Sequence, residues 1–242
     1  MYEVKVNKID NPENKVIAMA SITVDEKFVL NSIKVCKSDN PDNKRGFFIG
    51  MPTFKKSGTD EQGKDQYGEY FKPCKKEIAE AIYDAVQKSL TTGDPVKIRE
   101  GQKESFSTFV RPVSFENSST KAFVTVSIKP EGSVAKEGEE KVTDFVIDSM
   151  RVNESSKDGS VYVAPPSYKN KDGEYKDLCF PITKEFREEL YGDILEKFDI
   201  AIGKTDSKEA SKTFEKGSNS ENIGDKAKGG ELNEGTISNK RR

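Results

Sequence analysis

Residues 28–35 read FVLNSIKV, and residues 145–152 read FVIDSMRV. Four of the eight positions are identical, and the other four exchange one residue for a similar one. Apolar and β-branched residues dominate both stretches and partly alternate with polar ones, which is typical of β-strands. The chain therefore contains the same predicted strand twice.

Four more pairs of matching blocks flank these strands in the same order. They are KVIAMASI at 15–22 with KAFVTVSI at 121–128, GFFIGMP at 46–52 with SVYVAPP at 160–166, GEY at 68–70 with GEY at 173–175, and KEIAEAIY at 76–83 with KEFREELY at 184–191. The offset between the copies varies from 105 to 117 residues, so the insertions fall in the connecting loops. Five collinear matches indicate an internal duplication.

The last block of each copy predicts an amphipathic helix. Apolar residues recur at helical spacing in both copies, at Ile78, Ile82, Ala85, Val86 and Leu90 and again at Phe186, Leu190, Ile194, Leu195 and Phe198. Thr183 suits the N-cap of the second helix, and Gly93 and Pro95 are expected to end the first.

These patterns divide the 242 residues into four parts. We predict a first repeat at 1–90, a linker at 91–105, a second repeat at 106–203 and a disordered tail at 204–242. The tail has only six apolar residues in thirty-nine positions, too few to offset the entropy of ordering it. Fifteen extended linker residues would span about 50 Å, which is long enough for the two repeats to pair.

Composition excludes several classes of function. The chain has no His, which rules out imidazole catalysis and His-ligated metals. It also lacks phosphate-binding and dinucleotide-binding loops and a nucleophile elbow, so we expect no enzymatic activity, no cofactor and no metal site. Cys74 and Cys179 both follow a GEY motif and are expected to be equivalent, small buried residues.

The expected location is the cytoplasm. Three cysteines, an odd number, argue against a disulfide framework, and the first residues show no secretory signal. No apolar stretch approaches the length that spans a membrane.

The order of the blocks resembles the SpoVG (stage V sporulation protein G) family in both copies. ASIT at 20–23 and GFFIGMPT at 46–53 carry the resemblance in the first repeat. VAPPS at 163–167 and DGEYKD at 172–177, close to the family's DGEFRD loop, carry it in the second. The resemblance implies an α+β fold in which each repeat is a small, mostly antiparallel sheet with a C-terminal helix. Because family members are dimeric, the tandem copies are expected to form an intramolecular pseudo-dimer.

The resemblance also implies a non-enzymatic bacterial regulator that is linked to sporulation and septation and binds DNA or, in some members, RNA. Lysines that can neutralise phosphates and aromatic rings that can stack on bases gather around the GEY segments. The predicted nucleic-acid-binding residues are Phe54, Lys55, Lys56, Lys72, Lys75, Lys76, Tyr168, Lys169, Lys171 and Lys176. The family has Arg after GEF. At that position this chain has Phe71, followed by Lys72, in the first repeat and Lys176 in the second. A lysine lacks the bidentate fork of Arg.

The uneven distribution of charge between the repeats keeps a second possible function open. Residues 1–90 carry a net charge of +1, residues 106–203 carry −5 and the tail carries +2. A polyanion would meet the first repeat or the tail more readily than the second repeat. The alternative is a protein-interaction or scaffold protein in septation that binds no nucleic acid.

Overall fold

The computed structural model describes residues 1–10, 15–134, 142–170 and 172–203. The first repeat and the segment after it supply β1 (Tyr2–Lys8), β2 (Val16–Val24), β3 (Phe28–Lys37), β4 (Phe47–Gly50), β5 (Thr53–Thr59), β6 (Asp65–Glu69), β7 (Phe71–Pro73), α1 (Lys76–Thr92) and β8 (Val96–Ile98). The second supplies β9 (Glu104–Pro112), β10 (Thr120–Pro130), β11 (Phe145–Glu154), β12 (Val161–Ala164), β13 (Ser167–Lys169), β14 (Tyr175–Asp177), β15 (Cys179–Pro181) and α2 (Lys184–Ala201). The fold is α+β with antiparallel sheets, as the sequence predicts.

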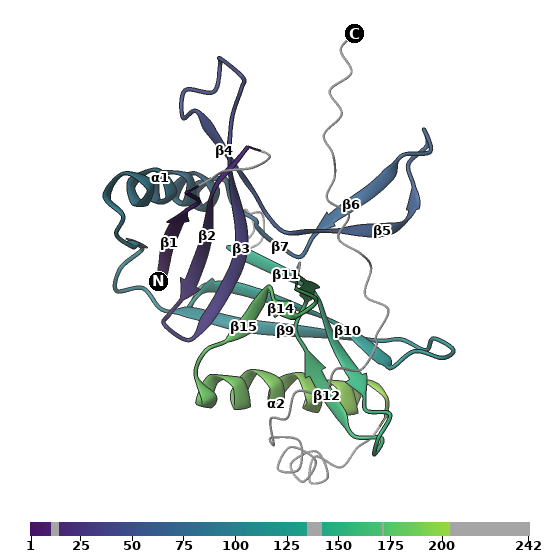
Figure 1. The fold of residues 1–242 in the computed structure, drawn as a ribbon. Coiled ribbons are helices and arrows are strands. Elements are labelled where there is room, and N and C mark those ends of the chain that lie inside the picture. Colours follow the sequence, from purple (N-terminus) through teal and green to yellow (C-terminus); the bar gives the residue numbers. More distant parts are fainter. Residues whose placement is uncertain (11–14, 135–141, 171, 204–242) are drawn as a thin grey trace.

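The two repeats exchange one strand each. The first sheet has the order β15-β3-β2-β1-β8, with β4 also paired to β3, so the second repeat contributes its strand β15. The second sheet has the order β12-β11-β10-β9, with β7 of the first repeat paired to β11. This reciprocal exchange makes the single chain an intramolecular pseudo-dimer (Figure 1).

The repeated FV-x-(N/D)-S motif forms a β-bulge at the point where the strand changes partner. Ser32 and Ser149 adopt left-handed backbone conformations, with φ of 62° and 72°, and the register of the neighbouring strand shifts there. Such a bulge bends the strand. Before the bulge, β3 pairs with the exchanged strand β15; after it, β3 pairs with β4 of its own repeat. β11 divides in the same way between β7 and β12.

The residue before each left-handed Ser joins the two repeats. The Asn31 backbone N–H donates to the Leu178 carbonyl oxygen over 2.7 Å, and the Asp148 N–H donates to the Tyr70 carbonyl over 2.7 Å. Each acceptor directly precedes an exchanged strand. The motif that reveals the duplication therefore also forms hydrogen bonds between the two repeats.

A second pair of equivalent hydrogen bonds corrects the alignment of the cysteines. The Cys74 N–H donates to the Asp144 carbonyl over 2.7 Å, and the Ile182 N–H donates to the Lys27 carbonyl over 2.9 Å. Cys74 therefore matches Ile182, whereas Cys179 lies on the exchanged strand at the position of Phe71. The shared GEY motif predicts the wrong equivalence because the segment after it differs in length between the two repeats.

One continuous apolar core joins the repeats. Tyr2 packs on Phe145 with ring centroids 5.4 Å apart, and Phe106 packs on Phe28 at 5.6 Å. Both pairs join residues of different repeats at equivalent positions. Burial of these large rings, at about 25 cal/mol per Å² of apolar surface, stabilises the pairing of the repeats.

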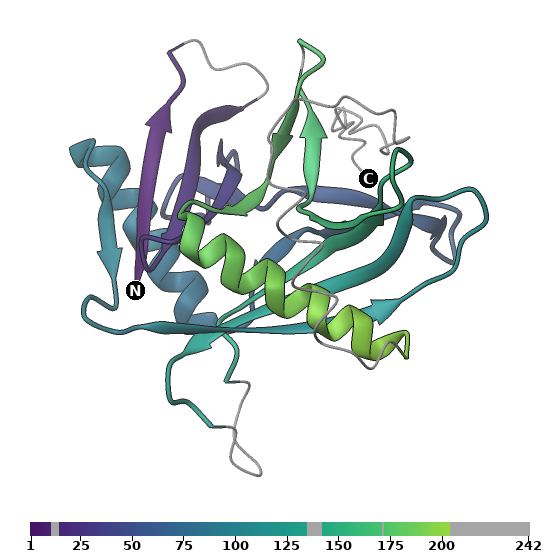
Figure 2. The ribbon, with the colours of Figure 1, turned by 90° about the horizontal axis from the view of Figure 1, so that it is seen from below.

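The helices follow their predicted boundaries and cover the sheets. The Thr183 side chain accepts a hydrogen bond from the Phe186 N–H, which confirms it as the N-cap of α2. Gly93 ends α1 in a left-handed conformation with φ of 82°. Most of the apolar residues predicted for the two helices are buried, although Leu90 is only partly so. α2 packs against the second sheet, where it contacts β9 and β12 (Figure 2).

The segment 91–105 contains more regular structure than a plain linker. α1 extends to Thr92, β8 pairs with β1 at the edge of the first sheet, and β9 begins at Glu104. The predicted tail, 204–242, lies outside the described residues.

Candidate nucleic-acid interface

The segment that contains Phe54, Lys55 and Lys56 is a β-hairpin. β5 pairs with β6 through Phe54↔Gly68 and Lys55↔Tyr67, and an irregularity in register follows Lys55. The Asp60 carboxylate accepts hydrogen bonds from two backbone N–H groups of the turn, at 2.9 and 2.8 Å. The β5–β6 hairpin extends away from the two main sheets (Figure 1).

Phe54 anchors the base of this hairpin. Its ring packs on Tyr70 with the centroids 5.0 Å apart and lies over the backbone of Gly68. A Cβ atom at residue 68 would come within 2.7 Å of the Phe54 Cζ atom, so the ring needs a glycine beneath it. Phe54 is half-buried by these contacts.

The two lysines beside Phe54 differ in their partners. The Lys55 ammonium lies 2.8 Å from the Asp65 carboxylate across the hairpin, and this hydrogen bond raises the pKa of Lys55. Lys56 is exposed and has no carboxylate partner among the residues that the structure describes. The exposed Lys55–Asp65 pair contributes little stability, so an anion can replace Asp65 at Lys55. The ammonium groups of both Lys55 and Lys56 are therefore available to an anion.

Lys75 points into the interface between the repeats. Its ammonium lies 2.9 Å from Oδ1 of Asp144, which is fully buried, and only 21% of the Lys75 side chain is exposed. Arg99 and the Tyr2 hydroxyl contact the other oxygen of the same carboxylate, at 2.5 and 3.0 Å. The contact with the buried Asp144 carboxylate thus gives Lys75 a structural role at the interface between the repeats.

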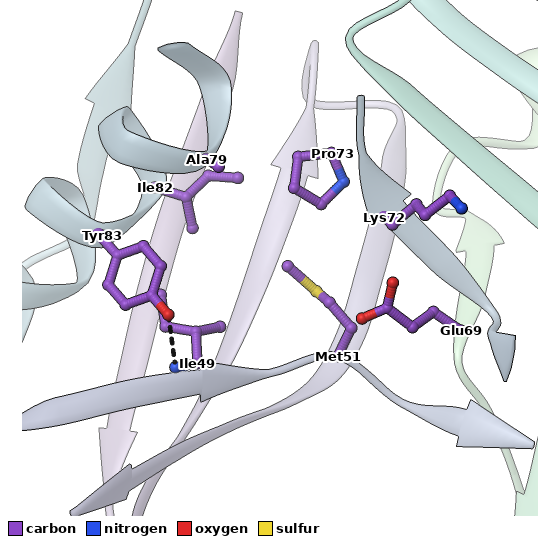
Figure 3. A pocket seen from close by; sticks show the side chains of 8 residues that line it. All are labelled: Ile49, Met51, Glu69, Lys72, Pro73, Ala79, Ile82 and Tyr83. Atoms are coloured by element: carbon purple, nitrogen blue, oxygen red, sulfur yellow. Dashed lines mark hydrogen bonds between the residues drawn. The ribbon is translucent and has the colours of Figure 1, made fainter. Parts of the chain in front are cut away.

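Lys72 and Lys76 are exposed at the end of β7 and the start of α1. Lys72 borders a pocket of about 210 Å³ between β4, β7 and α1, shown in Figure 3. The pocket is mainly apolar, and its lining residues are Ile49, Met51, Glu69, Lys72, Pro73, Ala79, Ile82 and Tyr83. The Ile49 N–H donates to the Tyr83 hydroxyl over 3.2 Å and fixes one wall.

The second repeat has a shorter hairpin, β13–β14, at the equivalent place. Tyr168 is half-buried against the core, and Lys169 is exposed beside it. The Lys176 ammonium lies 2.8 Å from Glu174; their hydrogen bond raises the pKa of Lys176 and lowers that of Glu174. Lys171 lies outside the described residues.

The predicted residues therefore fall into three groups. Phe54, Lys55 and Lys56 lie together on β5. Lys72 borders the pocket, Lys76 lies at the start of α1 and Lys75 is turned inward. The described residues of the third group, Tyr168, Lys169 and Lys176, lie on β13 and β14. In the described part of the chain, no group of three or more acidic or Cys side chains is placed to hold a metal ion. Within the same residues no helix is long and apolar enough to cross a membrane.

Sequence reasoning overlooked the outward-facing residues of the second sheet. Phe123 lies in the KAFVTVSI block, and its register partners are Arg111 and Arg151. The alternation of apolar and polar residues in VTVSI at 124–128 is the signal that could have identified this face.

Comparison with known proteins supports the duplication. The SpoVG family model matches residues 1–91 and 140–200, which together make up more than half of the chain. Curated relatives named "Putative septation protein SpoVG" occur in Lachnoclostridium phytofermentans, at 36% identity over 75 residues, and in Agathobacter rectalis, at 37% over 76 residues.

These alignments span 28% of this chain but 78% and 85% of the relatives, respectively, as expected when one repeat matches a whole short protein. No solved structure matches the chain. The chain belongs to the SpoVG family and carries its domain twice.

Proposed function

We propose that this protein is a non-enzymatic bacterial regulator that binds nucleic acid through its two hairpins and takes part in the control of septation and sporulation. One observation supports this most directly. Each repeat places a half-buried aromatic ring beside an exposed lysine at the base of a hairpin, Phe54–Lys55 in the first and Tyr168–Lys169 in the second.

The chemistry of this arrangement suits a polyanion. Lysines on a projecting hairpin can approach phosphates without desolvating the core, and each neutralised phosphate releases counterions. Lys56, Lys72, Lys76 and Lys176 extend the basic character around the two hairpins. We leave Lys75 out of the proposed contact surface because the buried Asp144 carboxylate holds it.

Salt-dependent binding tests this proposal. Fluorescence anisotropy of labelled DNA and RNA should show affinity that falls as salt rises from about 50 to about 200 mM. Lys55→Gln with Lys169→Gln should reduce the slope of log affinity against log salt by about 0.7–0.9 for each lost phosphate contact. Lys88→Gln, at an exposed position on α1, is the matched control and should leave the slope unchanged.

Absence of binding at low salt, over many DNA and RNA sequences, would remove the proposal. A septation scaffold without nucleic-acid binding is then the second candidate. The acidic surface of α2 favours it, because six carboxylates and only three basic groups lie on that helix. Under this alternative the lysine variants keep full activity in septation.

A further inference from the structure

The face of the second sheet that points away from α2 carries an unusual row of side chains. Along β10, Ala122, Val124 and Val126 are buried in the core, so the residues between them face the opposite side. On that side Phe123 pairs with Arg111 of β9 and with Arg151 of β11. Three neighbouring strands thus place Phe123 between two arginine residues on one face of the sheet.

The geometry of the row is that of an open aromatic platform. The Arg111 Cζ atom lies 5.7 Å from the centroid of the Phe123 ring, and the Phe115 ring meets Phe123 edge-on at 6.2 Å. Phe109, one outward position along β9 from Arg111, is 68% exposed, and Phe115 is 53% exposed. Several aromatic rings left in solvent on one sheet face mark a binding surface.

The two guanidinium groups are available to a ligand. Neither Arg111 nor Arg151 forms an ion pair with any carboxylate in the described part of the chain. Burial raises the pKa of the nearby Tyr70, and the positive charge of Arg151 partly opposes that rise. Since Tyr70 packs on Phe54, the row continues toward the base of the β5–β6 hairpin.

The first repeat shows that the fold does not require this row. Its equivalent residues, related by the same strand registers, are Asn7, Met19 and Lys34. The registers thus correct the sequence match of these strands by two residues, since KVIAMASI and KAFVTVSI pair Phe123 with Ile17. These side chains of Asn7, Met19 and Lys34 occupy the corresponding places on the first sheet, with one positive charge and no aromatic ring. Phe109, Arg111 and Phe123 also lie outside the segments that match the family model. The row is therefore specific to the second repeat of this chain.

Much of the net negative charge of the second repeat lies away from this face. Residues 106–203 carry −5, but α2 alone carries six acidic and three basic residues. This helix covers the opposite face of the sheet (Figure 2). The charges of the helix are thus separated from the arginine row by the thickness of the sheet. Asp148 lies on the same face as the row, where its carboxylate accepts a hydrogen bond from the Thr125 hydroxyl over 3.1 Å.

We propose that the outer face of the second sheet binds single-stranded nucleic acid, with an unpaired base stacked on Phe123 and the neighbouring phosphates bound by Arg111 and Arg151. This inference rests on the proposed nucleic-acid function and locates its base-contacting site. A ring on a sheet surface can reach the face of an unpaired base but not the faces of bases stacked in a duplex. Arg supplies the planar fork that matches phosphate, which the lysines of the hairpins lack.

The absence of Trp from the chain gives a direct test. Phe123→Trp places one fluorescent indole on the platform, and Met19→Trp places one at the equivalent position of the first sheet. An oligonucleotide of about 12 unpaired residues should quench the indole of the Phe123→Trp variant strongly and that of the Met19→Trp variant weakly. The same sequence annealed to its complement should quench neither.

Affinity changes provide a second measurement. Phe123→Leu keeps an apolar side chain and should weaken single-strand binding between about five-fold and about a hundred-fold. Met19→Leu is the matched control and should leave affinity unchanged. Circular dichroism melting of both variants, compared with the wild-type chain, confirms that each is folded.

The outcomes separate this inference from the broader proposal. Tight binding by anisotropy without quenching of the Phe123→Trp variant would overturn the platform while leaving the hairpin contacts in place. Binding of no oligonucleotide at low salt would overturn both. Equal competition by poly-glutamate would show a general anion surface and would also overturn the assignment of a base-stacking site.

Discussion

Lys27 and Asp144 occupy equivalent positions in the two repeats, directly before β3 and β11, and have opposite charges. The Lys27 ammonium lies over the rings of Phe106 and Phe186, 5.1 and 4.6 Å from their centroids. Asp144 is fully buried and is bound by Lys75, Arg99 and the Tyr2 hydroxyl. The two ends of the pseudo-dimer interface have therefore diverged, one toward cation–π contact and the other toward a buried ionic cluster.

Asp144→Ala should destabilise the protein strongly. It removes the carboxylate that pairs with both Lys75 and Arg99, and the loss of one partner from a buried ion pair costs about 3 kcal/mol. Urea unfolding measures the change in the free energy of unfolding.

Lys27→Met is the matched control at the other end of the interface. It keeps an aliphatic chain over the two rings and removes only the cation–π attraction, worth about 0.5–1 kcal/mol. A loss for Lys27→Met as large as that for Asp144→Ala would contradict the ionic role given to Asp144.

The raised pKa of Glu104 should make the free energy of unfolding fall as pH rises. It is buried beside Asp144 and Tyr2, and burial raises its pKa, although the Met1 amino group at 3.2 Å opposes this. An acid with a raised folded-state pKa contributes most below its unfolded pKa of about 4.3 and loses that contribution as pH rises through the folded value.

Glu104→Gln isolates this contribution. The free energy of unfolding of the wild type should fall relative to that of Glu104→Gln as pH rises from about 4.3 through the raised pKa of Glu104 in the folded protein. Thermal melts at a series of pH values measure it. A difference that does not change with pH would show that Glu104 has the same pKa in both states.

Gly68→Ala should displace the ring of Phe54. The new methyl group would lie 2.7 Å from the ring carbon, and moving the ring breaks its contact with Tyr70, worth about 0.5–1.5 kcal/mol. Hydrogen exchange of the β5–β6 amides should speed up. Gly50→Ala is the control, because its nearest neighbour would be 3.8 Å away; equal effects would argue against the anchoring role of Phe54.

The cysteines should differ in reactivity. Cys179 is fully buried, and this burial raises the pKa of its thiol, whereas Cys74 is partly exposed. Because the thiolate is the reactive form, iodoacetamide should modify Cys74 much faster than Cys179 in the native protein. Mass spectrometry of peptides after timed labelling checks the order, and unfolding in urea should abolish the difference.

Local structure was largely predictable because it depends on neighbouring residues. The spacing of Phe186, Leu190 and Ile194 identified α2, and Thr183 identified its start. The hairpin after Pro52 was not predicted, because its exposed strands lack the apolar alternation that indicates a strand. The lysine at 75 could not be recognised as structural, since its partner Asp144 is far away in the sequence.

The duplication of a SpoVG-like domain can be read from the amino-acid order alone, because FVLNSIKV and FVIDSMRV repeat with their flanking blocks in the same order. The crossing of β7 and β15 to the other repeat, and the row formed by Arg111, Phe123 and Arg151, emerge only when the chain is folded. A two-residue alternation records which face of a strand is buried, but the partner at each edge and its register depend on packing between distant segments.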